Sequence, residues 1–184
     1  CGGDAVEDIC GICDNDDSNN CYELEIDLDV NSNLISFPAL PGNGDYSVEN
    51  IFGSLGDNLI GVFGEGKAFV NWLGNGLIGS LTEVAQDEGY WVIINTFPDT
   101  LVIDGAVPVS YDGLDNSGEP CTDCNNGEVD YEMHYGSNLI SYPFQTAQDL
   151  NDALGEAADN VYALAGEGIA ALNTDNDWVG SLTT

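Results

Sequence analysis

The chain of 184 residues contains no arginine, one lysine (Lys67) and one histidine (His134). Against these stand 33 Asp and Glu residues, which give a formal net charge of -32 at pH 7. Proteins that bind nucleic acids neutralise phosphates with Lys and Arg, and anionic membrane surfaces attract the same side chains. We therefore expect neither nucleic acid nor an anionic membrane surface as a partner.

Long apolar runs are also missing, since no stretch approaches the roughly 18 consecutive apolar residues that a membrane-spanning helix needs. Membrane insertion is therefore not expected. The composition nevertheless differs from that of an acidic disordered tail, because 43% of the residues are hydrophobic and 9% are aromatic. That apolar content can offset the entropy lost on ordering, so we predict a folded chain.

The uncompensated negative charge makes the folded state repel itself, so it must be screened or neutralised from outside. Salt or divalent cations would do this. At about 0.5 M salt the Debye length falls to roughly 4 to 5 Å, and neighbouring carboxylates largely cease to interact. The sequence therefore favours a saline habitat.

Six cysteines lie in two stretches that are rich in Asp, Asn and Gly: Cys1, Cys10, Cys13, Cys21, Cys121 and Cys124. An even number outside the apolar runs is typical of disulfides in an oxidising, extracellular environment, although the spacing leaves their pairing open. The alternative is a zinc site, because Cys10 and Cys13, like Cys121 and Cys124, form a CxxC pair. Disulfides are favoured because the segment between the pairs is far longer than in a zinc ribbon.

The sequence repeats itself at a spacing of a little over about one hundred residues. Asn33–Pro38 (NLISFP) returns as Asn138–Pro143 (NLISYP). Four further matches keep the same order: Asp57-Asn58 with Asp159-Asn160, Gly64-Glu65-Gly66 with Gly166-Glu167-Gly168, Asn71 with Asn173, and Gly79-Ser80-Leu81-Thr82 with Gly180-Ser181-Leu182-Thr183. We predict a Cys/Asp-rich linker (1–21), a β-rich module (22–110), a second linker (111–124) and an incomplete second module (125–184).

Strands are predicted to dominate each module. Glu23–Val30 alternates acidic with apolar residues, as half-buried strands do, and Val129–Met133 repeats this in the second copy. Further strands are predicted at the apolar runs Leu59–Phe63, Tyr90–Asn95 and Leu101–Ile103. The fold class is therefore mainly β: two tandem, β-sandwich-like modules, each with one short helix.

The helices are predicted from their N-terminal signals. Ser47 can cap a helix over Val48–Leu55. In the second copy, Thr146 with Asp149 three residues later resembles a capping box that begins a helix over Ala147–Ala158.

The second copy holds no counterpart of Tyr90–Asp104, because Thr184 aligns with Glu83. Natural proteins rarely leave the apolar edge of a half-built sheet unpaired. We expect the chain to continue beyond Thr184, with strands donated by a neighbouring molecule as the alternative.

Two acidic loops, Asp14–Asn20 and Asp112–Glu119, are dense in the oxygen ligands that calcium prefers. The spacing of an EF-hand is absent, so composition alone makes Ca2+ the candidate cation. Asp14, Asp16 and Asp17 are the candidate ligands. The alternative is a pair of solvated turns tied by disulfides.

Catalysis finds little support in the sequence. His134 lies in a predicted strand over Val129–Tyr135, which extends the alternating run Val129–Met133. It has no counterpart in the first copy and is more simply a surface histidine. Trp72, Trp91 and Trp178 could stack on sugars, but aromatic residues within apolar strands are more often core. We expect no catalytic residue.

The opening CGGDAVEDICGICDNDDSNNC resembles the CGGxAVxDxCGxC repeat of large secreted proteins of marine bacteria and of marine phage proteins. The NLIS[FY]P segment, a short helix and Gly89-Tyr90-Trp91 are similar to a β-rich repeat of secreted bacterial surface proteins. The resemblance implies modularity, an extracellular or cell-surface location, or a virion, and no known active site.

These observations together lead us to expect a non-enzymatic structural or adhesive protein that builds a fibre, sheath or surface appendage. Its partners would be copies of itself, assembled by module stacking or strand exchange and stabilised by disulfides and cations. One alternative is a virion surface protein, such as a capsid decoration or tail fibre. The other is a carbohydrate-binding module of a secreted enzyme, with surface glycans as its partner.

Overall fold

The computed structural model describes residues 21–71, 77–108, 131–143, 147–174 and 177–183, and the backbone of two short paired strands, β1 (Val6–Glu7) and β2 (Cys13–Asp14). The chain forms two compact units, Cys1–Phe144 and Gln145–Thr184, which we call unit 1 and unit 2. It is mainly β, with several antiparallel sheets and few short helices, as the alternating pattern predicted.

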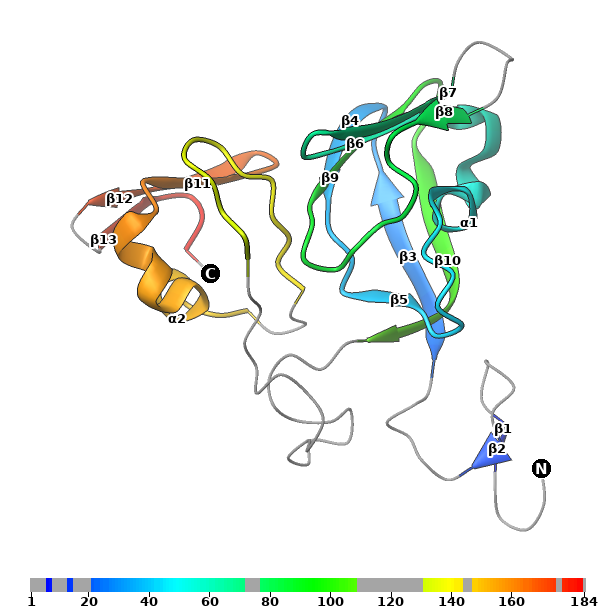
Figure 1. Cartoon of the computed structure of the whole chain (residues 1–184), viewed down its shortest axis with the longest axis horizontal. Helices are drawn as coiled ribbons and strands as arrows, with labels where there is room; N and C mark the ends of the chain where they lie inside the picture. Colours follow the sequence, from blue (N-terminus) through cyan, green and yellow to red (C-terminus); the bar gives the residue numbers. More distant parts are fainter. Residues whose placement is uncertain are drawn as a thin grey trace. The chain divides into compact units, whose positions relative to one another are not determined.

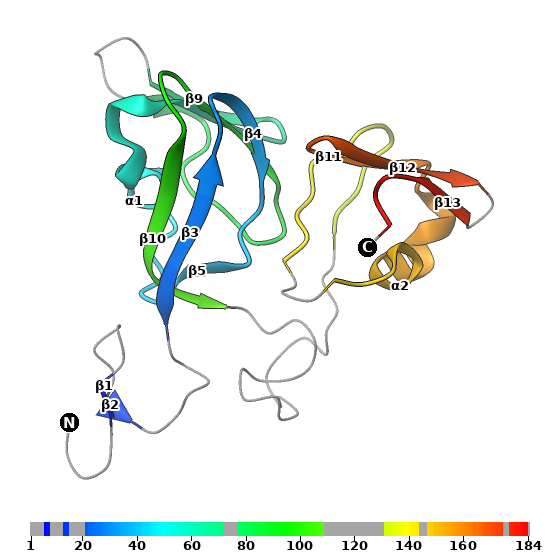
Figure 2. The ribbon, with the colours of Figure 1, turned by 180° about the vertical axis from the view of Figure 1, so that it is seen from behind.

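Besides the short β1–β2 pair, the described part of unit 1 contains two antiparallel sheets (Figures 1 and 2). The larger sheet has five strands in the order β4 (Asn31–Ile35), β9 (Tyr90–Ile94), β6 (Leu59–Gly64), β7 (Lys67–Asn71) and β8 (Leu77–Gly79). The smaller sheet has three strands in the order β3 (Tyr22–Leu28), β10 (Asp99–Pro108) and β5 (Ala39–Pro41). Strand β9 is thus an inner strand, with β4 on one side and β6 on the other.

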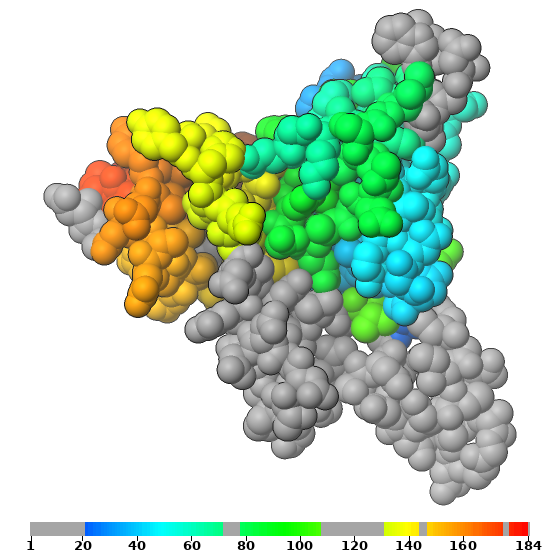
Figure 3. Space-filling model, in the orientation of Figure 1, coloured from blue at the N-terminus to red at the C-terminus, as the bar shows by residue number. Residues whose placement is uncertain are grey.

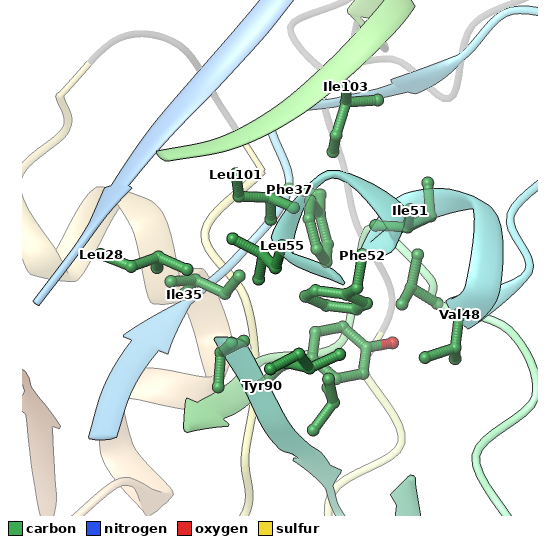
Figure 4. Close-up of a cluster of buried hydrophobic side chains, with 14 of the residues drawn as sticks. Leu28, Ile35, Phe37, Val48, Ile51, Phe52, Leu55, Tyr90, Leu101 and Ile103 are labelled. Carbon is green, nitrogen blue, oxygen red and sulfur yellow. The ribbon is translucent and has the colours of Figure 1, made fainter. Parts of the chain in front are cut away.

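Side chains of both sheets and of helix α1 (Val48–Ile51) form one core, as expected for a β-sandwich-like module (Figure 4). The Phe37 ring lies 6.0 Å from the Phe52 ring and 5.7 Å from the Tyr90 ring, measured between centroids. In β3 the exposed acidic residues alternate with Leu24, Ile26 and Leu28, which point toward the core. The acidic and apolar alternation therefore predicted this strand correctly.

Unit 2 reproduces part of the same arrangement. Its sheet has the order β11 (Ala163–Gly166), β12 (Ile169–Thr174) and β13 (Asp177–Gly180). The β11–β12 hairpin pairs Gly166 with Ile169, and the β6–β7 hairpin pairs Gly64 with Lys67 in the same register. The second loop residue, Gly66 or Gly168, has a positive φ, which glycine adopts without steric cost. The sequence repeat is therefore a repeated hairpin.

The repeated Gly-Ser-Leu-Thr segment holds the far edge of each hairpin in place. A Cβ atom at Gly79 would lie 1.9 Å from the Ala68 carbonyl oxygen, and one at Gly180 would lie 2.0 Å from that of Ala170. The two carbonyls accept hydrogen bonds from matching amides, those of Ser80 and Leu81 in unit 1 and of Ser181 and Leu182 in unit 2. Glycine is required there because the backbones approach too closely for a side chain.

Both helices differ from the sequence prediction. Helix α1 ends at Ile51, a 3-10 helix (η2, Gly53–Asn58) follows it, and the Ser47 hydroxyl donates to Asp45 Oδ1 instead of capping the helix. Helix α2 covers only Leu150–Leu154 and is followed by η3 (Gly155–Asn160). It begins later than predicted because Asp149 is itself the cap, its carboxylate accepting a hydrogen bond from the Asn151 amide.

The strand predicted at Val129–Met133 is wrong for its described residues, since 131–133 belong to no strand. In unit 1 the corresponding strand, β3, is paired along its length with β10. The described part of unit 2 contains no counterpart of β10, so the alternating pattern has no strand to pair with. Tyr131–Pro143 also lies in unit 1, although the repeat places it at the start of the second module.

We expect Gly79→Ala to destabilise the protein by about 1 to 3 kcal/mol, because the added methyl group must displace backbone atoms. Gly53→Ala is the matched control, since its Cβ meets nothing within 4 Å and its φ is not positive. Urea unfolding followed by circular dichroism measures both. An equal effect of the two substitutions would show that the close approach at Gly79 is not what the module requires.

Candidate interaction site

A segment distant in sequence, Tyr131–Pro143, packs on the loop that precedes β9 in unit 1 (Figure 3, yellow on green). The Gly89 amide donates to the Leu139 carbonyl over 3.4 Å. The Ser141 amide donates to the Asp87 carbonyl over 3.2 Å, and the Ser141 hydroxyl donates to the carbonyl of Gln86. This backbone pairing resembles a short added strand.

The Asn of the repeated NLIS motif shapes this segment. Asn138 Oδ1 accepts from the His134 amide at 2.8 Å, and Asn138 Nδ2 donates to the His134 carbonyl at 3.0 Å. Asn33 makes the same two bonds to the backbone of Asp29, each 2.8 Å long. His134 therefore lies in a turn closed by Asn138, and the prediction that it lies in a strand is wrong.

Glu65, in the β6–β7 turn, holds the segment at its other end. Glu65 Oε2 accepts a 2.7 Å hydrogen bond from the Leu139 amide, and Oε1 contacts His134 Nε2. The Leu139 amide, and then His134, lower the pKa of the Glu65 carboxyl. The pKa of His134 is raised, first by the Tyr135 carbonyl that faces Nδ1 at 3.1 Å and then by Glu65.

The surroundings of His134 determine what it can do chemically. Both ring nitrogens face oxygen atoms that favour the protonated imidazolium, and in the part of the chain that the structure describes neither faces a Ser or Cys nucleophile. The arrangement is a charge-assisted clamp between the Tyr131–Pro143 segment and the β6–β7 turn. We call it the Glu65–His134 clamp.

Lys67, the only basic residue besides His134, is also used within unit 1. Lys67 Nζ lies 2.6 Å from Glu88 Oε1, and Glu88 Oε2 accepts a 2.8 Å hydrogen bond from the Tyr90 hydroxyl. The same hydroxyl accepts from the Ala85 amide at 2.8 Å. Burial is the main reason why the pKa of Tyr90 is raised. This chain of contacts positions the loop on which Tyr131–Pro143 packs.

Several carboxylates lie together at the surface of the described part of unit 1. A hollow of about 220 Å³ is lined by Asp27, Leu28, Asp29, Pro98, Asp99 and Thr100. Asp99 and Asp27 accept hydrogen bonds there from Asn58 and Thr100. A side-chain hydrogen bond between Glu23 and Asp104 raises the pKa of Glu23. Among the described residues, no group of three or more His, Cys, Asp or Glu side chains could hold a metal ion.

The residues predicted to bind calcium lie mostly outside this description. Asp14 is described only by its backbone in β2, and Asp16 and Asp17 fall in a part of the chain that the structure does not describe. Of the cysteines, Cys21 is buried and disulfide-bonded. Cys1, Cys10, Cys121 and Cys124 lie outside the described residues, and Cys13 is described only by its backbone. The calcium site stays a prediction, and so do the disulfides of the other five cysteines.

The three tryptophans have different surroundings. Trp91 points out of β9 with 39% of its surface exposed, and Trp178 Nε1 donates to Asn151 Oδ1 at 2.9 Å. Trp72 falls outside the described residues.

Comparison with protein-family models, curated proteins and solved structures finds no match for this chain. Among the described residues, no helix is long and apolar enough to cross a membrane. Glu65 and Asn138 were not predicted as site residues. The signal for both was present in the repeat, because each belongs to a segment that returns in the other copy.

The Glu65–His134 clamp can be tested directly by titrating His134, because the chain contains no other histidine. We expect its imidazole to titrate above the ordinary pKa near 6.5, and Glu65→Gln to lower that pKa. As the control, Glu49→Gln removes one negative charge from the first turn of α1 and should leave the pKa of His134 unchanged. Proton NMR of the imidazole ring measures all three proteins. The same His134 pKa in wild type and Glu65→Gln would rule out the clamp.

The pH dependence of the clamp follows from the two shifts. The stability that protonated His134 gives to the docked segment is fully present below the ordinary histidine pKa. It is lost as the pH rises through the raised pKa of His134. The contribution of Glu65 is present above its ordinary pKa and is lost as the pH falls through its lowered pKa. Docking of Tyr131–Pro143 should therefore be strongest between these limits.

Proposed function

We propose that this chain is a non-enzymatic, extracellular structural or adhesive protein, a building block of a fibre, sheath or surface appendage. It assembles with copies of itself through stacking of modules or exchange of strands. Disulfides and bound cations stabilise the linkers between the modules. The proposal places the protein outside the cell or on its surface.

The proposal rests on one observation: the repeated residues make the same structural contacts in both copies. Asn33 and Asn138 close matching turns, and Gly79 and Gly180 allow matching close approaches of the backbone. Asn71 donates from Nδ2 to the Leu59 carbonyl, and its counterpart Asn173 donates to the Val161 carbonyl. Each of these residues builds the module. Because the repeated residues maintain the backbone structure of the module, they support a structural role for the protein.

The electrostatics support the same proposal. Lys67 is paired with Glu88, and His134 contacts Glu65, so both potential cations are already engaged within the fold. The remaining carboxylates must be balanced by ions from solution. Such a surface opposes close packing of copies at low ionic strength and permits it once cations are bound or the charges are screened.

The proposal predicts cation-dependent assembly. At about 0.5 M NaCl or in millimolar CaCl2 the chain should sediment as large species that electron microscopy shows as ordered assemblies. In chelator at low salt it should be monomeric and melt at a lower temperature. Comparing NaCl with CaCl2 at equal ionic strength separates screening from calcium binding.

A protein that stays monomeric in all of these solutions, with one melting temperature throughout, would contradict the proposed function. The measurement uses the full chain with its cysteines oxidised.

A further inference from the structure

The starting point is an edge of the unit 2 sheet. In unit 1, strand β6 has two neighbours, β7 on one side and β9 on the other. Its counterpart β11 pairs with β12, and no described strand of unit 2 lies along its other edge. The position that β9 occupies in unit 1 thus has no strand within the described part of unit 2.

The hydrogen-bonding groups of this edge can be deduced from the register. Neighbouring residues of an antiparallel strand alternate between bonding one side and the other. The Asn173 amide donates to the Tyr162 carbonyl, and the backbone of Ala170, opposite Ala165, bonds to Ser181 on the far side. Ala163 and Ala165 therefore direct their N–H and C=O groups away from β12, toward the edge.

The unit 1 counterparts of these two residues are Gly61 and Phe63. In the β6–β9 pair, Gly61 lies opposite Ile93 and Phe63 lies opposite Trp91. The edge of β11 thus presents backbone groups at the same positions from which β6 pairs with β9.

The apolar side chains of unit 2 indicate the same missing neighbour. In unit 1 the core positions Phe52, Leu59, Val62 and Leu81 are all buried. Their unit 2 counterparts are only partly buried: Leu154, Val161, Leu164 and Leu182. In unit 1 these positions belong to one core with Tyr90, Val92 and Ile94 of β9 and with Leu101 and Ile103 of β10. The β9–β10 segment therefore supplies side chains that the described unit 2 lacks.

We propose that unit 2 binds a segment of the β9–β10 sequence type, whose β9-like strand pairs with β11 through Ala163 and Ala165 and whose apolar side chains complete the core. The occupant carries apolar residues at alternate positions, as Tyr90, Val92 and Ile94 do. This inference rests on the proposed function and deepens it, because it names the partner in strand exchange. It is a case of β-augmentation, in which the backbone supplies affinity and alternate side chains supply specificity.

The test uses a fluorescent synthetic peptide of residues 87–104 (DEGYWVIINTFPDTLVID), added to the full chain under conditions in which the chain is monomeric. Saturable binding by fluorescence anisotropy is the expected result. The control peptide carries Ser at the positions of Tyr90, Val92 and Ile94 and should bind at least about tenfold more weakly. Equal binding of the two peptides, or none, overturns the inference with no variant required.

Two variants of the chain locate the site. Ala165→Pro removes an N–H that faces the edge while sparing the β12 ladder, and proline is tolerated on edge strands. Ala165→Ser keeps the N–H. We expect binding to be lost in Ala165→Pro and kept in Ala165→Ser, with circular dichroism showing that both fold. Equal affinity of the two variants would overturn the placement at β11.

The remaining outcomes separate this inference from the proposed function. If the chain dimerises through β11, with dimers lost in Ala165→Pro and no peptide binding, the occupant is a second copy of unit 2 and the inference fails. If the peptide does not bind but cation-dependent assembly persists, the inference fails and the proposed function stands. If the peptide binds and no assembly forms in any solution, the proposed function fails and the site remains.

Discussion

The pairing of β9 with both β4 and β6 is the interaction on which the module depends. It joins the first strand of the five-stranded sheet to the hairpin that follows α1, and it brings Tyr90 against Phe37 in the core. Next to it, the loop that precedes β9 carries Glu88, and through Glu88 the Lys67 contact. Where β9 is present, Phe52, Leu59, Val62 and Leu81 are buried. In unit 2, whose described residues contain no counterpart of β9, the four equivalent residues are only partly buried.

The second general constraint is charge. A chain with 33 acidic residues and one lysine has few ways to stabilise itself by ion pairing, so backbone and amide hydrogen bonds replace it. The turn at Asn33, the contacts of Asn71 and the docking of Ser141 are of this kind. The Lys67–Glu88 ion pair and the Glu65–His134 clamp are the exceptions, and they use the single lysine and the single histidine. Such a fold leaves its carboxylates to be neutralised by solution cations.

Sequence patterns predicted the features that depend on local periodicity. The alternation in β3, the apolar run of β9 and the mainly β class follow from residues that are neighbours in the chain. The repeat marked the Gly-Glu-Gly segments, which form the turn of the shared hairpin, without predicting the hairpin itself. The sequence predictions were wrong where contacts with other parts of the chain determine the structure. Residues 131–133 alternate like a strand but have none to pair with, and Asp149 proved to be the cap of α2. The clamp joins residues 69 positions apart, which no local pattern reveals.

Hydrogen exchange of the full chain, resolved by NMR, tests most directly the claim that a β9-type strand completes each module. The amides of Gly61 and Phe63 should be protected at least about 100-fold more than those of Ala163 and Ala165, because only the first pair faces a neighbouring strand. Equal protection at the two pairs of amides in the monomeric chain would contradict the account.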